Sequence, residues 1–174
     1  MTARFEERLT GGHPNSLGNT IEVVDEVLAS KAKLRELVDC YKSSDEVVRL
    51  RVSNGVKRVS KEHPDWVMEY IDELQSWVSE IDQPSTHWTL SWLFEHLHAH
   101  MSEAQRLRAV EIMKHNLTHD DDWIVQNNTL AALAHYAKGD KELTEWLIPE
   151  LKKSTKSKHK SVARRAEKLL VVLA

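Results

Sequence analysis

Apolar residues recur along this chain at spacings of three and four positions, the periodicity of an amphipathic α-helix. Strict alternation of apolar and polar residues, the mark of a half-buried strand, is not sustained anywhere. Capping residues or an N1 proline precede most of the apolar stripes, as at Ser44-Asp45, Pro84-Ser85 and Ser102. We therefore predict an all-α chain. The expected helices span residues 31–42, 45–61, 64–82, 85–100, 103–117, 121–138, 140–153 and 159–173, with two shorter ones near 3–9 and 16–29.

Four of these helices follow one template, with apolar or small residues at positions x, x+4, x+7, x+8 and x+11. The four stripes begin at positions 48, 86, 125 and 162, which are 38, 39 and 37 residues apart. Any amphipathic helix carries one such stripe, but four in register at a near-constant period indicate stacked helix pairs. The stripes are Val48, Val52, Gly55, Val56 and Val59; Thr86, Leu90, Leu93, Phe94 and Leu97; Val125, Thr129, Ala132, Leu133 and Tyr136; and Val162, Ala166, Leu169, Leu170 and Leu173.

The segment Asp45-Glu-Val-Val-Arg-Leu-Arg-Val-Ser-Asn-Gly-Val resembles the second-helix signature of HEAT repeats, an Asp followed by Val-Arg and small residues. Residues 122–133 and 160–170 look like degenerate copies, whereas the second repeat rests on periodicity alone. The resemblance covers residues 31–173 and implies a right-handed α-α superhelix, a solenoid of about four HEAT-type helix pairs. We expect one domain over residues 1–174, with an N-terminal helical cap (1–30) and repeats at about 31–63, 64–101, 102–139 and 140–174.

The resemblance also implies a scaffold or adaptor that binds a peptide or a partner protein on the concave surface formed by the second helices. On a helix that turns 100° per residue, positions x+2, x+6 and x+9 lie opposite the buried stripe. Trp88 and Trp92 lie there one turn apart, and they either line the groove or pack between repeats. The predicted binding residues are Asn54, Lys57, Trp88, Trp92, Glu95, Asn127, Arg164 and Lys168.

The distribution of charge keeps nucleic acid open as an alternative ligand. Residues 1–150 hold 16 basic and 26 acidic residues, whereas the segment from Lys152 to Lys168 holds eight Lys or Arg and one acid. Tryptophan rings could stack on bases while basic side chains neutralise phosphates. The surface then resembles that of HEAT-like DNA glycosylases for alkylated bases. Gln126 takes the place of an arginine in their Trp-Ile-Arg-Arg segment, so we do not expect their catalysis. The basic segment could equally be the solvated outer face of a capping helix.

The sequence indicates no catalytic residue, metal ligand set or cofactor site. His96 and His100 lie one turn apart, as do His115 and His119, and such pairs can ligate a transition metal. HEAT-type metalloenzymes such as deoxyhypusine hydroxylase repeat a His-Glu pair, but this chain has only the reversed order, once. We therefore interpret these histidines as surface or packing residues.

Composition places the chain among soluble globular proteins. The chain has 174 residues, of which 41% are hydrophobic and 29% charged. Cys40 is its only cysteine, which excludes an internal disulfide and a cysteine-based zinc cluster. No apolar run approaches the roughly 20 residues of a spanning helix, and the first residues show no secretory signal. We expect a soluble, cytoplasmic protein without a membrane partner and with an undetermined oligomeric state.

Overall fold

The computed structural model describes residues 4–174, and every regular element in that range is helical, as the apolar periodicity predicted. Short helical turns accompany the longer helices: η1 (Lys31–Lys33), η2 (Cys40–Lys42) and η4 (His98–His100) are 3₁₀ turns, and η3 (Leu74–Val78) is a π-helical segment. The α-helices are α1 (Phe5–Leu9), α2 (Thr20–Ala29), α3 (Leu34–Asp39), α4 (Glu46–Glu62), α5 (Pro64–Met68), α6 (Ile71–Glu73), α7 (Pro84–His96), α8 (Glu103–His119), α9 (Trp123–Ala137), α10 (Lys141–Ser154) and α11 (Lys160–Leu173).

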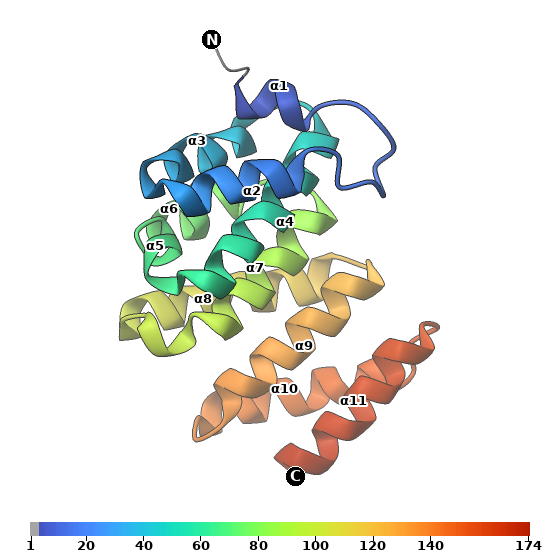
Figure 1. Cartoon of the computed structure of the whole chain (residues 1–174). Helices are drawn as coiled ribbons and strands as arrows, with labels where there is room; N and C mark the ends of the chain where they lie inside the picture. The colour runs from blue at the N-terminus through green and yellow to red at the C-terminus, as the bar shows by residue number, and fades with distance from the viewer. Residues whose placement is uncertain (1–3) are drawn as a thin grey trace. The chain divides into compact units, whose positions relative to one another are not determined.

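The helices form two compact units, one of the described residues up to Thr89 and one of Leu90–Ala174. In the first unit, α4 packs against α1, α2, α3 and α5. In the second unit, α9 packs against α8, α10 and α11, and Figure 1 shows α9 and α11 side by side. Helices thus contact helices close to them in sequence, which is how an α-solenoid is built. The helical-repeat fold class is confirmed, while the single domain and its repeat boundaries stay predictions.

The repeat stripes form the core. Every member of the stripes that begin at Val48, Thr86 and Val125 is buried. In the fourth stripe Val162 and Ala166 are buried, but the three leucines toward the C-terminal end of α11 are only half-buried. No described helix follows α11, so only α9 and α10, which precede it, pack against this helix. The template therefore predicted the buried face correctly in three repeats and at two of the five positions of the fourth.

Several contacts join residues that are one repeat apart. Arg35 and Glu73 differ by 38 positions, as do Ser91 and Thr129, whose hydroxyl oxygens lie 2.9 Å apart in the second unit. The side chains of Lys31 and Glu69 also pair across 38 positions. These contacts connect equivalent positions of successive repeats, so the sequence period is also the spacing at which the helices stack.

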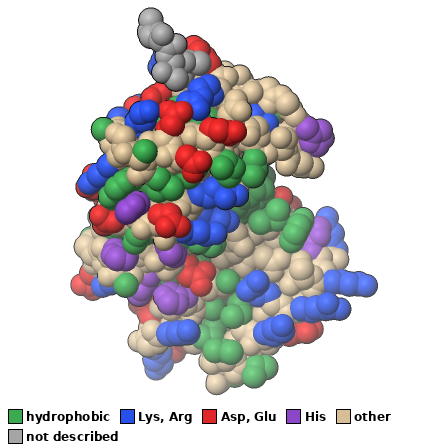
Figure 2. Space-filling view, viewed as in Figure 1, with side chains coloured by type: hydrophobic (Ala, Val, Ile, Leu, Met, Phe, Trp, Pro, Cys, Tyr) green, Lys and Arg blue, Asp and Glu red, His purple; other side chains and the backbone are tan. Residues whose placement is uncertain are grey.

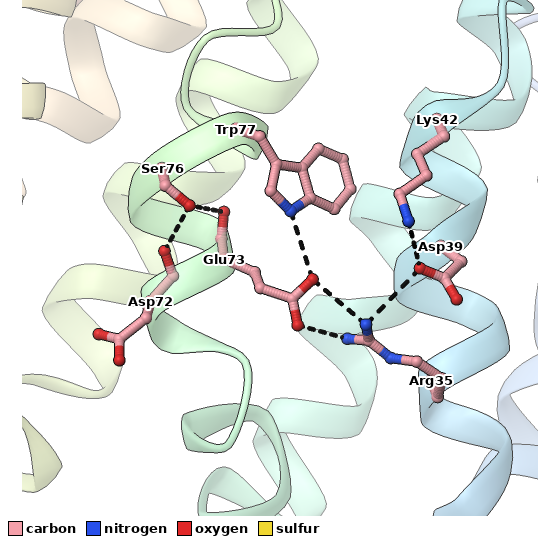
Figure 3. Close-up of polar contacts among 7 residues, drawn as sticks. All are labelled: Arg35, Asp39, Lys42, Asp72, Glu73, Ser76 and Trp77. Carbon is pink, nitrogen blue, oxygen red and sulfur yellow. Dashed lines mark hydrogen bonds and ion pairs between the residues drawn. The ribbon is translucent and has the colours of Figure 1, made fainter.

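The Arg35–Glu73 ion pair connects α3 to α6 on the surface of the first unit (Figure 3). The Arg35 guanidinium donates to the two carboxylate oxygens of Glu73 at 2.7 and 3.2 Å. The indole nitrogen of Trp77 donates to the same carboxylate at 3.3 Å. Asp39 lies 3.6 Å from Arg35 and accepts a hydrogen bond of 2.9 Å from Lys42. The hydrogen bond from Arg35 lowers the pKa of Glu73, because it favours the ionised carboxylate.

Two predicted helices are wrong in their continuity. The segment predicted as one helix over 64–82 is broken at Tyr70, whose φ of −107° and ψ of 5° are not helical, and it continues as η3. There the hydroxyls of Ser76 and Ser79 bond to the carbonyl oxygens of Asp72 and Ser76 at 2.7 and 2.8 Å, and such bonds compete with the regular helical ladder. The helix predicted at 85–100 is interrupted at Leu97, whose φ of −92° and ψ of 1° separate α7 from η4. Residues 31–42 are helical throughout, as predicted, although the two ends are 3₁₀ turns and only α3 is α-helical.

Arg51 organises the loop between α1 and α2. Its side chain is only 2% exposed, although arginine is rarely buried without partners. The guanidinium donates to the carbonyl oxygens of Leu9 and Gly11 at 2.6 Å, of Ser16 at 3.2 Å and of His13 at 3.3 Å. Residues 10–19 are exposed and contribute no apolar core. The loop is therefore folded around one guanidinium.

The first prediction concerns Gly18, which lies beside this guanidinium. Its φ is +52°, and a Cβ atom there would come within 2.9 Å of the Arg51 guanidinium carbon. Gly11 is a matched control, because its φ of +76° is also positive but a Cβ would meet nothing within 4 Å. Gly11→Ala should lower the free energy of unfolding by about 1–2 kcal/mol, the cost of a left-handed alanine. Gly18→Ala should lower it by more, measured by urea denaturation; equal losses would contradict the role of Arg51.

The second prediction compares the same template position in a covered and an uncovered stripe. Leu133 is fully buried, whereas Leu170 on α11 is half-buried. Leu133→Ala should lower the free energy of unfolding by about 2–5 kcal/mol, because it removes buried methyl groups and leaves a cavity. Leu170→Ala should cost clearly less in the same urea titration. Similar losses would mean that the two stripes are equally covered in solution.

The third prediction concerns the pH dependence of the Arg35–Glu73 pair. Because the pKa of Glu73 is lower in the folded chain, its contribution to stability is present above the ordinary glutamate pKa and is lost as the pH falls through the folded value. The difference in unfolding free energy between wild type and Glu73→Gln should be under about 1 kcal/mol at neutral pH, since both partners are partly exposed. It should shrink on acidification below about pH 4. A difference that does not change with pH would show that the ion pair contributes nothing.

Candidate functional site

A groove of about 620 Å³ lies between α9 and α11 in the second unit. Its volume falls within the range of typical ligand pockets. One wall comes from the first turns of α9 and the other from α11, the neighbouring helices in Figure 1. None of the lining residues is acidic. The groove is lined by Trp123, Ile124, Asn127, Asn128, Ser161, Arg164, Arg165, Lys168 and Leu169, and we call this set the α9–α11 groove.

Asn127 connects the two walls of the groove. Its amide nitrogen donates to the Ser161 hydroxyl at 3.1 Å, and its amide oxygen accepts from Nε of Arg165 at 3.2 Å. The side chain is 8% exposed, and Arg165 lies 38 positions further along the chain. Asn127 therefore fixes the distance between α9 and α11, and it holds Arg165 in one orientation.

Trp123 lies in the groove at the N-terminal end of α9. The Asp122 carboxylate caps this helix by accepting from the backbone N–H groups of Ile124 and Val125 at 2.8 and 3.1 Å. The cap sets Trp123 at the first helical position, where its side chain is 47% exposed. Ile124 and Leu169, which also line the groove, are half-buried. An exposed tryptophan beside apolar neighbours is the type of residue that dominates binding energy at interfaces.

The rim of the groove is basic. Arg164 and Lys168 lie one turn apart on α11, and both are exposed. Figure 2 shows Lys and Arg side chains gathered over α11. The segment from Lys152 to Lys168 contains eight basic residues and one acid in a chain whose net charge is −3, and three of these basic residues, Arg164, Arg165 and Lys168, line the groove.

The structure brings together three of the eight predicted binding residues. Asn127, Arg164 and Lys168 line the α9–α11 groove. Trp92 and Glu95 lie on α7 in the second unit and do not line this groove; the ring of Trp92 stacks on His96 with centroids 4.6 Å apart.

The other three predicted binding residues belong to the first unit. Asn54 accepts a hydrogen bond from Arg58 at 2.7 Å, and burial lowers the pKa of Lys57. Trp88 and Trp92 are both half-buried. This exposure is intermediate between the two alternatives from the sequence, in which the rings either line the groove or pack between repeats.

The prediction missed Trp123, Ile124, Ser161 and Arg165 because it treated each helix alone. A groove between two helices is lined by their flanks. Ile124 and Ser161 both occupy position x−1 of their repeats, and Asn128 and Arg165 both occupy x+3. These two positions, taken together with x+2, account for six of the nine lining residues; Trp123, Lys168 and Leu169 lie at other positions.

Other chemistry singled out in the sequence gives no second site. Among residues 4–174 no group of three or more His, Cys, Asp or Glu is placed to hold a metal ion. The rings of His115 and His119 stack with centroids 4.1 Å apart. Cys40 is buried, and this burial raises the pKa of its thiol to about 12, so it stays protonated at neutral pH. No helix in the described part of the chain is both long and apolar enough to cross a membrane.

Comparisons with known proteins add little. No protein-family model matches the chain. A search of curated proteins finds no match either. Among solved structures the chain is similar to a designed armadillo repeat protein, YIII(Dq)4CqI, with a TM-score of 0.44 and 16% sequence identity over 98% of each chain. The assignment to the helical-repeat class therefore rests on the helices, burial and contacts of this chain itself.

Proposed function

We propose that this chain is a helical-repeat interaction module of the HEAT type that binds a segment of a partner protein in the α9–α11 groove. The observation that carries the proposal is a half-exposed Trp123 in a groove whose two walls are joined by the hydrogen bonds of Asn127. Support for the HEAT type comes from the helix caps, because the Asp that opens the HEAT-like signature caps α4 through Asp45 and α9 through Asp122. Scaffolds of this class present such surfaces to peptides and proteins.

The groove suits an extended peptide segment. Trp123, Ile124 and Leu169 offer apolar surface for one side chain of the ligand, and polar groups surround them. Interfaces with an apolar centre and a polar rim are typical of protein recognition. The Asn127 contacts already hold both walls in place, so binding does not incur the entropic cost of ordering them.

The proposal narrows the surface predicted from the sequence. It retains Asn127, Arg164 and Lys168 and adds Trp123 as the anchor. Trp88 and Trp92, which the sequence analysis placed at the centre of the binding face, are not needed for it.

The fourth prediction tests this groove. Displayed peptides of random sequence are selected on the immobilised full chain, and recovered peptides are titrated against variants by fluorescence anisotropy. Trp123→Ala should weaken binding at least about tenfold, which is about 1.4 kcal/mol. Leu107→Ala is the matched control, because Leu107 is a 61% exposed apolar residue on α8 outside the groove, and it should bind like wild type.

Circular dichroism would verify that both variants keep their helical content. Equal affinities for wild type and Trp123→Ala would show that the peptides bind elsewhere. Failure to recover any binding peptide would overturn the proposal.

A further inference from the structure

We infer that the segment bound in the α9–α11 groove is acidic, an extended peptide in which an apolar residue is followed by Asp or Glu. This inference rests on the proposed function and names the chemistry of its ligand. Three of the nine residues that line the groove are basic and none is acidic. A ligand with carboxylates would meet the positive charge that the groove presents, so charge complementarity selects it.

The charges of the groove are not neutralised within the described chain. Arg164 and Lys168 are exposed and form no ion pair with a carboxylate of residues 4–174. Arg165 is held by the amide oxygen of Asn127, which is a neutral partner. That hydrogen bond orients the guanidinium but leaves its full positive charge, so Arg165 is preorganised for a carboxylate that the protein itself does not supply.

The distance between the apolar and the basic residues of the groove sets the spacing between the apolar and the acidic residues of the ligand. Trp123 occupies position x−2 of its repeat, and Lys168 occupies x+6 of the next one. Eight positions at about 1.5 Å per residue give roughly 12 Å along the helices. An extended chain covers about 3.3 Å per residue, so this distance corresponds to roughly three or four residues. An apolar side chain on Trp123 would therefore place an acidic side chain three or four positions away near Lys168. Arg164 occupies x+2, four positions or roughly 6 Å from Trp123, so it would meet an acidic side chain about two positions away.

The composition of the groove favours an acidic peptide over single-stranded nucleic acid. Nucleic-acid grooves stack successive bases on several aromatic side chains and follow the phosphates with many cations. Among the nine lining residues Trp123 is the only aromatic one, whereas Ile124 and Leu169 are aliphatic. An aliphatic pocket beside one tryptophan fits a single apolar side chain better than a row of bases.

The fifth prediction uses three labelled probes: a synthetic peptide with one leucine followed by a run of glutamates, the same peptide with glutamine at every glutamate, and oligothymidylate of equal length. Their affinities for the full chain are measured by fluorescence anisotropy. The glutamate peptide should bind at least about tenfold more tightly than the glutamine peptide. Arg164→Gln/Lys168→Gln should reduce this preference by at least about threefold, because two of the three basic side chains that line the groove are then neutral and only Arg165 remains to meet the glutamates.

The control variant, Arg108→Gln/Lys138→Gln, removes the same charge from exposed residues of the second unit outside the groove, and it should behave like wild type. Equal binding of both peptides that depends on Trp123 would overturn the acidic ligand and leave the peptide groove standing. No binding of either peptide would overturn both proposals. Tighter binding of oligothymidylate, lost in the Arg164/Lys168 variant, would show a nucleic-acid site, and equal losses in the control variant would show non-specific attraction.

Discussion

The structure depends on contacts between residues that stand one repeat apart. Ser91 meets Thr129 and Asn127 meets Arg165 across the same 38 positions, and both contacts are inside the second unit. In a stack of repeats, each helix packs against the equivalent helices of the repeat before it and the repeat after it. Its two flanks must therefore be complementary to each other. This requirement explains why the apolar and small residues keep one template and why the helices keep nearly equal spacing. The stacking of equivalent helices therefore constrains the sequence to this period.

The elements that the sequence predicted well are those whose cause is local. The cap at Ser102, which accepts from the Gln105 N–H while the Gln105 side chain accepts from the Ser102 N–H, can be recognised from four consecutive residues. The buried stripes follow from helical periodicity in the same way. Arg51 could not be predicted, since its acceptors are backbone carbonyl oxygens of a loop and no residue type marks them. The π-helical segment η3 also escaped prediction, because serine hydroxyls that bond to backbone carbonyl oxygens, as Ser76 and Ser79 do here, occur in many regular helices.

The lining of the α9–α11 groove overlaps only in part with the predicted binding residues, for a different reason. Helical arithmetic finds the face opposite a buried stripe, and it correctly placed Asn127 beside Arg164 and Lys168. The same reasoning did not include Trp123, because this residue precedes the stripe, at the first helical position after the cap at Asp122. Trp88 and Trp92 are half-buried, because large aromatic side chains on repeat helices are partly covered by their neighbours, and their place in a binding face stays a prediction. A groove between two helices is lined by residues of both, so it is described only when the positions on the two helices are considered together.

Asn127 joins the stability of the repeat to the chemistry of its surface. A carboxylate in its place would bind Arg165 more strongly, but it would cancel the charge of the guanidinium and leave the groove less attractive to an anion. A leucine would fill the space but would leave Ser161 and Arg165 without the bonds that fix them. A neutral amide satisfies both partners and leaves the positive charge in place. The same side chain that locks α11 onto α9 therefore also keeps the groove basic, and the stacking of the repeats determines what the surface between them can bind.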